Sequence, residues 1–197
     1  ITGTKDALRV QTIGQKIAVA ANQPNYKWEF NLVEDNQANA FCLPGGKVVV
    51  YTGILKYAKN DDQLATVISH EVAHALARHG AERVTQGMIQ QGVGLIGSVA
   101  VAATAPQYQN AFNQAYGLGS NLGVMLPYGR MQESEADEIG IYLMHKAGYN
   151  VNEAAKIWEN MSEGKSGGND FFSTHPSSQN RTKDIQTVIN KIGNEAK

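Results

Sequence analysis

The chain has 197 residues, of which 42% are hydrophobic, and its formal net charge is -1. This length supports one domain with a core of its own and is too short to expect two. Nucleic acid is excluded as an expected partner, because no basic stretch is available to neutralise a run of phosphates. The single cysteine, Cys42, excludes an internal disulfide and a four-cysteine zinc site.

The sequence begins at Ile1, without an initiator methionine or an apolar leader segment. From this start we expect a processed or trimmed chain from which a signal segment has been removed. The longest strongly apolar run without charge, residues 92–105, is shorter than the roughly 20 residues that a spanning helix needs. We therefore expect no transmembrane span, while peripheral or lipid-anchored membrane association and the oligomeric state stay open.

The first third of the chain is expected to form one helix and a small antiparallel sheet. Apolar side chains at helical spacing predict the helix, and the run Asn22-Gln23-Pro24-Asn25 ends it. Alternating or valine-rich runs predict three strands, with a turn at Pro44-Gly45-Gly46. The expected elements are a helix over residues 6–21, with an apolar stripe of Leu8, Val10, Ile13, Ile17 and Ala20, and strands over residues 28–33, 40–43 and 47–52.

The rest of the chain is expected to be mostly helical, which gives an α+β class over a single domain, residues 1–197. Asp61 and Asp62 suit a helix N-terminus, where they meet unpaired N–H groups. Residues 84–129 contain no charged side chain, and either a lid over a cleft or a closely packed helical pair fits them. The expected elements are helices over residues 61–83, 130–146, 153–161 (capped by Asn152) and 178–192, and a Gly-rich loop over residues 162–169.

The sequence His70-Glu71-Val72-Ala73-His74 lies inside the helix expected from residue 61. Positions i and i+4 share a face of a helix, so both imidazoles can reach one ion. Glu71 can take a proton from a zinc-activated water without being a ligand itself. The alternative is a pair of solvated histidines, but residues 66–76 carry no other charged side chain, which an exposed helix would not show. We expect one zinc ion per chain.

A catalytic zinc site needs a third protein ligand and an open position for water. His79 is expected to point away, because the fifth residue along a helix lies about 140° around its axis. Glu133 and Asp137 are spaced i and i+4, so one can ligate zinc while the other accepts an N–H from a ligand histidine. An acidic, solvated helix start is the alternative, and helix geometry alone does not separate Glu133 from Glu135.

Four separated segments resemble one family when they are taken in chain order. They are HEVAHALARH at residues 70–79, ESEADEIG at 133–140, residues 39–53 around the expected second and third strands, and Thr174-His175-Pro176 with Arg181 six residues after His175. They are similar to metallopeptidase family 48, a gluzincin family that includes the HtpX proteases, the CAAX prenyl endopeptidases and the soluble periplasmic BepA- and LoiP-like proteases. The resemblance implies a zincin-like zinc endopeptidase. We expect neither the membrane helices of the first two branches nor the helical repeat domain of BepA-like members, and therefore the short LoiP-like form.

The resemblance implies roles for individual residues of the zinc site. His70, His74 and Glu133 become the zinc ligands. Glu71 becomes the general base, and Asp137 becomes the partner that orients a ligand histidine.

The resemblance also implies roles for two residues near the C-terminus. His175 corresponds to a loop histidine that can occupy the fourth zinc position and keep the enzyme latent, or swing out and stabilise the oxyanion. Arg181 is either a further oxyanion donor or a structural ion pair with Asp137 or Glu135.

We expect metal-assisted hydrolysis of peptide bonds, in which Glu71 accepts a proton from water and passes it to the leaving amine. The substrate is expected to add as an extra strand along the edge formed by Asn39, Ala40, Phe41, Cys42 and Leu43. That mode reads extended chain, so unfolded or misassembled envelope proteins, in the periplasm or at the periplasmic face of the outer membrane, are the expected substrates by analogy. An aminopeptidase and a non-proteolytic zinc-containing chaperone or assembly factor are the alternatives.

Overall fold

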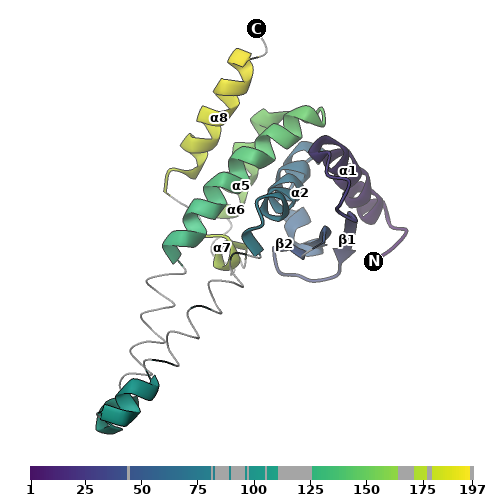
Figure 1. Ribbon diagram of the computed structural model, residues 1–197. Helices are drawn as coiled ribbons and strands as arrows, with labels where there is room; N and C mark the ends of the chain where they lie inside the picture. Colours follow the sequence, from purple (N-terminus) through teal and green to yellow (C-terminus); the bar gives the residue numbers. More distant parts are fainter. Residues whose placement is uncertain are drawn as a thin grey trace.

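The computed structural model describes residues 1–43, 45–80, 82, 89, 96, 98–104, 106–110, 126–163, 171–176 and 179–195. The elements follow the chain in the order α1 (Lys5–Ala21), β1 (Glu29–Val33), β2 (Ala40–Leu43), β3 (Lys47–Tyr51), η1 (Thr52–Lys56), α2 (Asp61–Leu76), η2 (Pro106–Tyr108), α5 (Leu126–Lys146), η4 (Val151–Glu153), α6 (Ala154–Glu163), α7 (Phe171–Thr174) and α8 (Arg181–Glu195). Figure 1 shows α2 between α1 and α5, with the strands next to α1 and α2.

The central element is α2, whose residues from Gln63 to His74 are all buried. Asn60 caps its N-terminus, because the Asn60 side chain accepts a hydrogen bond from the Gln63 N–H at 2.8 Å. Asp61 and Asp62 occupy the first turn, where their charges meet the positive end of the helix dipole. A helix buried on every side holds its polar side chains away from water, so those side chains must find partners inside the protein.

The sheet is mixed, not antiparallel as expected, and its strand order is β1-β3-β2. β2 and β3 are antiparallel, whereas β1 pairs with β3 in parallel. The cause is the loop of residues 34–39, which crosses the end of β3 and carries β2 to the far side of that strand. The Asp35 carbonyl fixes this crossing by accepting hydrogen bonds from Thr52 Oγ1 and the Gly53 N–H, each at 2.8 Å. Residue 53 must be glycine here, because a Cβ atom would overlap the carbonyl oxygen of Gln37.

Two expectations for the N-terminal half need correction. Leu8 is 54% exposed, so it does not belong to the buried stripe of α1, whose other four members are buried. The helix expected to run to residue 83 ends at Leu76. The chain then turns at Ala77 and Arg78, where Arg78 has a φ of 58°, and is helical again at His79.

The C-terminal helices begin at slightly different places from those expected. Asn150, not Asn152, caps the segment that leads into α6, and its side chain accepts from the Asn152 N–H. α8 begins at Arg181, not at residue 178. Most of residues 84–129 and of the Gly-rich loop lie outside the described residues, as does Pro44 of the expected turn, so the predictions for them stay predictions.

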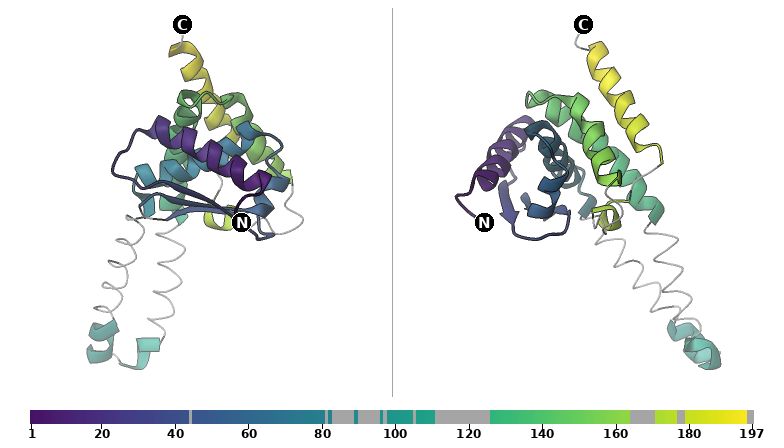
Figure 2. Two further views of the ribbon diagram at one scale, coloured as in Figure 1. Left: turned by 90° about the vertical axis from the view of Figure 1, so that its right-hand side faces the viewer. Right: turned by 180° about the vertical axis from the view of Figure 1, so that it is seen from behind.

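The mostly helical chain with a small mixed sheet agrees with the α+β class. α5 packs along α2, α6 packs against α2 and α8, and α8 packs against α5. In the right-hand view of Figure 2, α1 (purple) and α8 (yellow) lie on opposite sides of the molecule. Trp158 of α6 is 2% exposed and belongs to the core.

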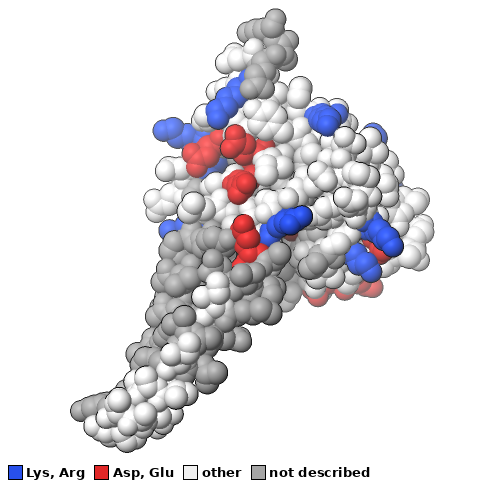
Figure 3. All heavy atoms as spheres, viewed as in Figure 1, with Lys and Arg blue, Asp and Glu red and all other residues white. Residues whose placement is uncertain are grey.

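The described surface agrees with the even charge balance of the sequence. On the face shown in Figure 3, basic and acidic side chains both occur and no continuous basic surface forms. Among the described helices, none is both long enough and apolar enough to cross a bilayer.

Candidate metal centre

α2 holds His70, Glu71 and His74 in the interior, where their exposed fractions are 1%, 1% and 8%. His70 and His74 are one helical turn apart, and their Nε2 atoms lie 3.1 Å from each other. Two ring nitrogens at this distance cannot both present lone pairs without repulsion. The pair therefore needs a proton or a cation between its members.

α5 supplies a carboxylate to the same point. Glu133 is 3% exposed, with Oε2 3.0 Å from His70 Nε2 and Oε1 3.1 Å from His74 Nε2. The side chain of Glu135 is 59% exposed and lies on another face of α5. The structure thus separates two glutamates that helix geometry alone left equivalent, and it brings Glu133 to the histidine pair.

His175 completes a cluster of four buried groups. It follows α7, its ring stacks on Phe171 with the centroids 4.3 Å apart, and its Nδ1 lies 3.0 Å from Glu133 Oε1. One ligand atom each from His70, His74, Glu133 and His175 lies within 4.8 Å of the other three.

The cluster fits a tetrahedral cation. Ligand atoms about 2.0–2.1 Å from a tetrahedral zinc ion lie about 3.3 Å from one another, and imidazole nitrogen with carboxylate oxygen is a ligand set that zinc takes. The two Nε2 atoms lie 3.1 Å apart, and each lies 3.0 or 3.1 Å from a different oxygen of Glu133, which is close to this spacing.

The second nitrogen of His175 reaches the sheet edge. The Asn39 carbonyl accepts the Tyr51 N–H of β3 at 2.9 Å, so it faces into the sheet. Successive carbonyls of a strand point to opposite sides, so the Ala40 carbonyl faces the open edge of β2. His175 Nε2 lies 3.3 Å from that Ala40 oxygen and 3.5 Å from Glu71 Oε1.

Asp137 and Arg181 stand behind His70. Asp137 Oδ1 lies 3.0 Å from His70 Nδ1, the ring nitrogen that faces away from the cluster. Arg181 donates to both Asp137 oxygens, at 2.8 and 2.7 Å, and its guanidinium lies 3.8 Å from the ring centroid of Trp158. Of the alternatives for Arg181, the ion pair with Asp137 is present, and the pair with Glu135 is not among the contacts of the described residues.

The pKa values follow from this crowding. Burial alone lowers the pKa of His70, but the carboxylates of Glu133 and Asp137 outweigh burial and raise it to about 9. Burial lowers the pKa of His74 to about 3, and the nearby His70 acts in the same direction. Burial opposes ionisation of Glu133, but its histidine neighbours outweigh that and hold its pKa well below the usual range. In the absence of an ion, a proton on His70 thus balances the negative charge of the carboxylates, as a bound cation can.

His79 is not part of the four-residue cluster, but the expectation that it points away from His74 is wrong. His79 is 2% exposed, its Nδ1 lies 2.9 Å from His74 Nδ1, and its Nε2 lies 3.2 Å from Glu135 Oε2. The expectation assumed an unbroken helix, whereas the turn at Arg78 brings His79 back toward His74. Gly80 follows two residues later, but the left-handed residue of the turn is Arg78, a residue type that does not signal this conformation.

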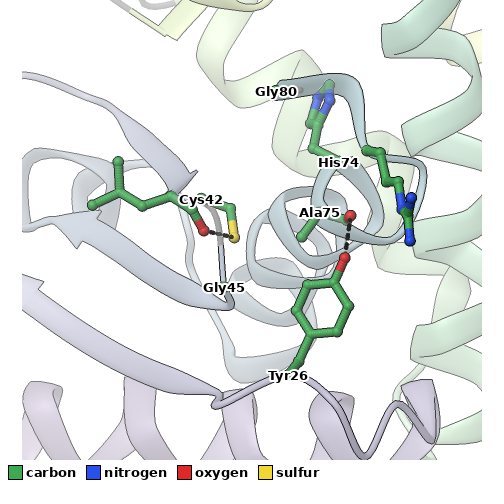
Figure 4. Close-up of a pocket in the computed structure, with 8 residues that line it drawn as sticks. Tyr26, Cys42, Gly45, His74, Ala75 and Gly80 are labelled. Atoms are coloured by element: carbon green, nitrogen blue, oxygen red, sulfur yellow. Dashed lines mark hydrogen bonds between the residues drawn. The ribbon is translucent and has the colours of Figure 1, made fainter. Parts of the chain in front are cut away.

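A cavity of about 270 Å³ opens beside His74, between the open edge of β2 and the end of α2 (Figure 4). It is lined by Tyr26, Cys42, Leu43, Gly45, His74, Ala75, Arg78 and Gly80. The Tyr26 hydroxyl is held by donating to the Ala75 carbonyl at 2.8 Å. Burial and the charge of Glu71 raise the pKa of Cys42 to about 12, so its thiol is protonated at neutral pH and contributes an apolar wall.

Comparison with known proteins extends over almost the whole chain. Residues 4–189 match the family model described as Peptidase family M48. The chain is 38% identical over 182 residues to the mitochondrial metalloendopeptidase OMA1 of Schizosaccharomyces pombe, covering 91% of this chain and 52% of that protein. It is 39% identical over 169 residues to the protein of the same name from Arabidopsis thaliana, covering 84% and 32%.

A bacterial relative is more distant. The beta-barrel assembly-enhancing protease of Escherichia coli K12 is 28% identical over 189 residues, covering 93% of this chain and 39% of that protein. The chain therefore spans about half, or less, of the length of these curated relatives.

Proposed function

This chain belongs to peptidase family M48, and from that premise we propose that it is a zinc-dependent endopeptidase of unfolded or misassembled proteins, kept latent by His175. The observation that carries the proposal is the buried cluster of His70, His74, Glu133 and His175, with Glu71 beside it. Membership in the family makes the chain a metalloendopeptidase. The identity of the metal, the residue roles, the zincin-like gluzincin assignment and the substrates are the parts proposed.

In this proposal His70, His74 and Glu133 hold the ion. Zinc, when bound, supplies a Lewis acid that acidifies a water and polarises the scissile carbonyl. Glu71 takes the proton of that water and delivers it to the leaving amine, a role that suits a buried carboxylate next to the ligands in sequence. Asp137 Oδ1, 3.0 Å from His70 Nδ1, is the acceptor proposed for the Nδ1–H, which would fix the ring with Nε2 toward the ion.

Substrate is proposed to pair with the open edge of β2, along Asn39 to Leu43. β2 lies at one end of the strand order, and a strand added there gains main-chain hydrogen bonds regardless of sequence. The cavity beside His74 then receives a side chain of the substrate. Its walls are mainly apolar, so we propose a preference for an apolar residue next to the scissile bond.

Latency is supported by the two contacts of one imidazole. His175 Nδ1 lies in the cluster, where it would take the fourth ligand position that water needs, while Nε2 can donate to the Ala40 carbonyl. In this position His175 blocks both the open coordination site and the substrate-binding edge. Swung out, it would free both and could serve the oxyanion, as the resemblance implies.

Arg181 is proposed to act through Asp137 and not on substrate. It is 5% exposed and both of its hydrogen bonds to side chains go to Asp137. Its Nη1 atom has no hydrogen-bond partner among the described residues, so the alternative of donation to the oxyanion remains a prediction.

Cleavage of unfolded casein by the zinc-loaded chain tests the proposal. We expect slow cleavage by the wild type, faster cleavage by His175→Ala, and none by Glu71→Gln alone or combined with His175→Ala. If the wild type and Glu71→Gln are equally inert and His175→Ala gains nothing, the alternative of a zinc-containing chaperone or assembly factor replaces this proposal. Release of single N-terminal residues in place of internal fragments would indicate an aminopeptidase.

The cellular setting is proposed from the bacterial relative. Its name, beta-barrel assembly-enhancing protease, favours the bacterial envelope, and we propose a periplasmic location there, whereas the OMA1 relatives are named as mitochondrial. Fractionation of the source cells checks this part separately. Recovery of the protein from the periplasmic or outer-membrane fraction would support it, and recovery from the cytosol or mitochondria would contradict it.

A further inference from the structure

We propose that His79 and Glu135 orient His74 as a metal ligand, as Asp137 and Arg181 orient His70. The inference rests on the proposed metal site and adds two positioning residues to it. His79 contacts His74 and Glu135 contacts His79, so both are proposed to act through His74.

The contacts of His74, His79 and Glu135 form a continuous series that leads out of the metal cluster. His74 Nε2 faces Glu133, and His74 Nδ1, on the other side of the ring, lies 2.9 Å from His79 Nδ1. His79 Nε2 lies 3.2 Å from Glu135 Oε2. His74 and His79 are 8% and 2% exposed, whereas the Glu135 side chain is 59% exposed. This series of contacts from His74 through His79 to Glu135, the relay, therefore starts in the interior and ends at the surface.

Metal ligation fixes the direction of every hydrogen bond in this relay. A histidine that binds a cation through Nε2 must carry its proton on Nδ1. His74 Nδ1–H then donates to His79 Nδ1, which must offer a lone pair. His79 is left with its proton on Nε2, which donates to the Glu135 carboxylate. The set is self-consistent only when His79 is neutral and Glu135 accepts.

The turn after α2 exists in a form that places His79 for this contact. In a continuous helix residue 79 would lie about 140° around the axis from residue 74. The helix instead ends at Leu76, and Arg78 adopts a left-handed conformation with a φ of 58°. A residue with a Cβ atom adopts that conformation at a cost in free energy, so other interactions must offset it. The buried contact of His79 with His74 is the interaction that this turn creates.

α5 carries Glu135, the last residue of the relay, on the same helix as the proposed metal ligand Glu133. Glu133 and Glu135 are two residues apart on one helix, so the helix that delivers a ligand to the cluster also delivers the last acceptor of the relay. Gln132 reaches the same turn, where its side-chain amide lies 3.5 Å from the His79 carbonyl oxygen. Movement of α5 would therefore disturb Glu133 and the orientation of His74 together.

Zinc affinity, measured by competition with a chromogenic chelator, tests the relay. His79→Phe keeps a ring but removes the acceptor, and we expect 10- to 100-fold weaker zinc binding, the usual effect of losing such a partner. His79→Asn offers an amide oxygen near the position of Nδ1, and we expect it to recover much of the loss. Glu135→Gln, at a side chain that is 59% exposed, should weaken binding about tenfold, the lower end of that range.

The matched control is Glu138→Gln, on the same helix and similarly exposed but paired with Lys191, and it should bind zinc as the wild type does. The ligand-field spectrum of the cobalt-substituted protein gives a second readout, because a rotated His74 changes the symmetry of the site. We expect this spectrum to change in His79→Phe and to return toward the wild-type form in His79→Asn.

Each outcome bears on a definite claim. If the wild type binds no zinc, the proposed function fails and the relay fails with it. If the wild type binds zinc and both His79→Phe and Glu135→Gln bind it equally well, the relay alone is overturned. Equal losses in His79→Phe and His79→Asn, with an unchanged cobalt spectrum, would also overturn it, because they would show a packing role only.

Discussion

Gly140 of α5 lies against the backbone of His70 on α2, so that a Cβ atom on residue 140 would come within 3.2 Å of the His70 nitrogen and 3.3 Å of its Cα. Both contacts are with helix backbone, which cannot rotate aside as a side chain can. The absence of a side chain at position 140 therefore sets how closely the two helices approach. It also sets the distance over which Glu133, on the same helix, reaches the histidine pair.

Gly140→Ala should push α5 away from α2 by a few tenths of an ångström. We expect destabilisation of about 1–3 kcal/mol, as for other overpacked sites, despite the higher helix propensity of alanine. Zinc binding should weaken as well, because Glu133 moves away from His70. Urea unfolding of the metal-free protein and chelator competition measure the two effects.

Gly193→Ala is the matched control for this substitution. Gly193 lies on α8, and a Cβ atom there meets nothing within 4 Å. It should stabilise the protein by up to about 1 kcal/mol and leave zinc binding unchanged. Equal stabilisation by the two alanines would show that contact with His70 does not limit the approach of α5.

Asp137→Asn should weaken zinc binding and destabilise the protein for different reasons. Zinc affinity should fall about 10- to 100-fold, because His70 loses its anionic acceptor. The metal-free protein should lose about 3–5 kcal/mol of stability, because the buried Arg181 charge loses the carboxylate that accepts two of its hydrogen bonds and keeps only the longer 3.7 Å contact with Glu133. The same two measurements, chelator competition and urea unfolding, separate these losses.

Combining Asp137→Asn with Arg181→Met tests this separation. Removal of the buried Arg181 charge should restore much of the stability, whereas the zinc affinity should stay low. Recovery of zinc affinity in the double variant would mean that Asp137 acts through the charge of Arg181 and not through the ring of His70.

The sequence predicted the parts of this site that depend on local geometry. The i, i+4 spacing of His70 and His74 needs only a helix, and the uncharged flanks of that helix predicted its burial. The features that the sequence did not predict depend on how the chain crosses between strands and on irregular backbone conformation. The parallel pairing of β1 with β3 follows from a loop that passes the end of β3. The return of His79 follows from one left-handed residue, Arg78, of a type that rarely adopts that conformation.

Zinc binding to the His175→Ala variant at pH 6 should release about one proton per ion. The pKa of His70 is raised to about 9, so its ring is protonated at this pH and must lose a proton to bind through Nε2. The pKa of His74 is lowered to about 3 and that of Glu133 is also lowered, so neither contributes a proton. Affinity should rise with pH, by up to about tenfold per unit, and level off above about pH 9.

Titration calorimetry in two buffers of different ionisation enthalpy counts the protons released. The same proton on His70 makes the free energy of unfolding of the metal-free protein depend on pH. Because the pKa of His70 rises from 6.5 in the unfolded chain to about 9 in the folded one, its stabilising effect is complete below pH 6.5 and is lost as the pH rises through 9. Zero proton release would show that His70 is already neutral without the ion.

Gly80→Leu should narrow the cavity beside His74 without straining the backbone. Gly80 lines the cavity, its backbone φ is not positive, and a Cβ atom there would meet nothing within 4 Å. A leucine side chain then occupies part of a space of about 270 Å³ that the proposal assigns to an apolar substrate residue. A difference of one methylene in such a pocket changes kcat/KM by about 10- to 200-fold.

Two peptides that differ only in phenylalanine or alanine at the residue next to the scissile bond measure this effect in the His175→Ala background. Gly80→Leu should lower kcat/KM for the phenylalanine peptide at least about tenfold relative to the alanine peptide. Because residue 80 follows His79, zinc affinity is measured on the same sample, and an unchanged value shows that the metal site is intact. An equal loss on both peptides would place the substrate side chain elsewhere, since a filled pocket must discriminate by size.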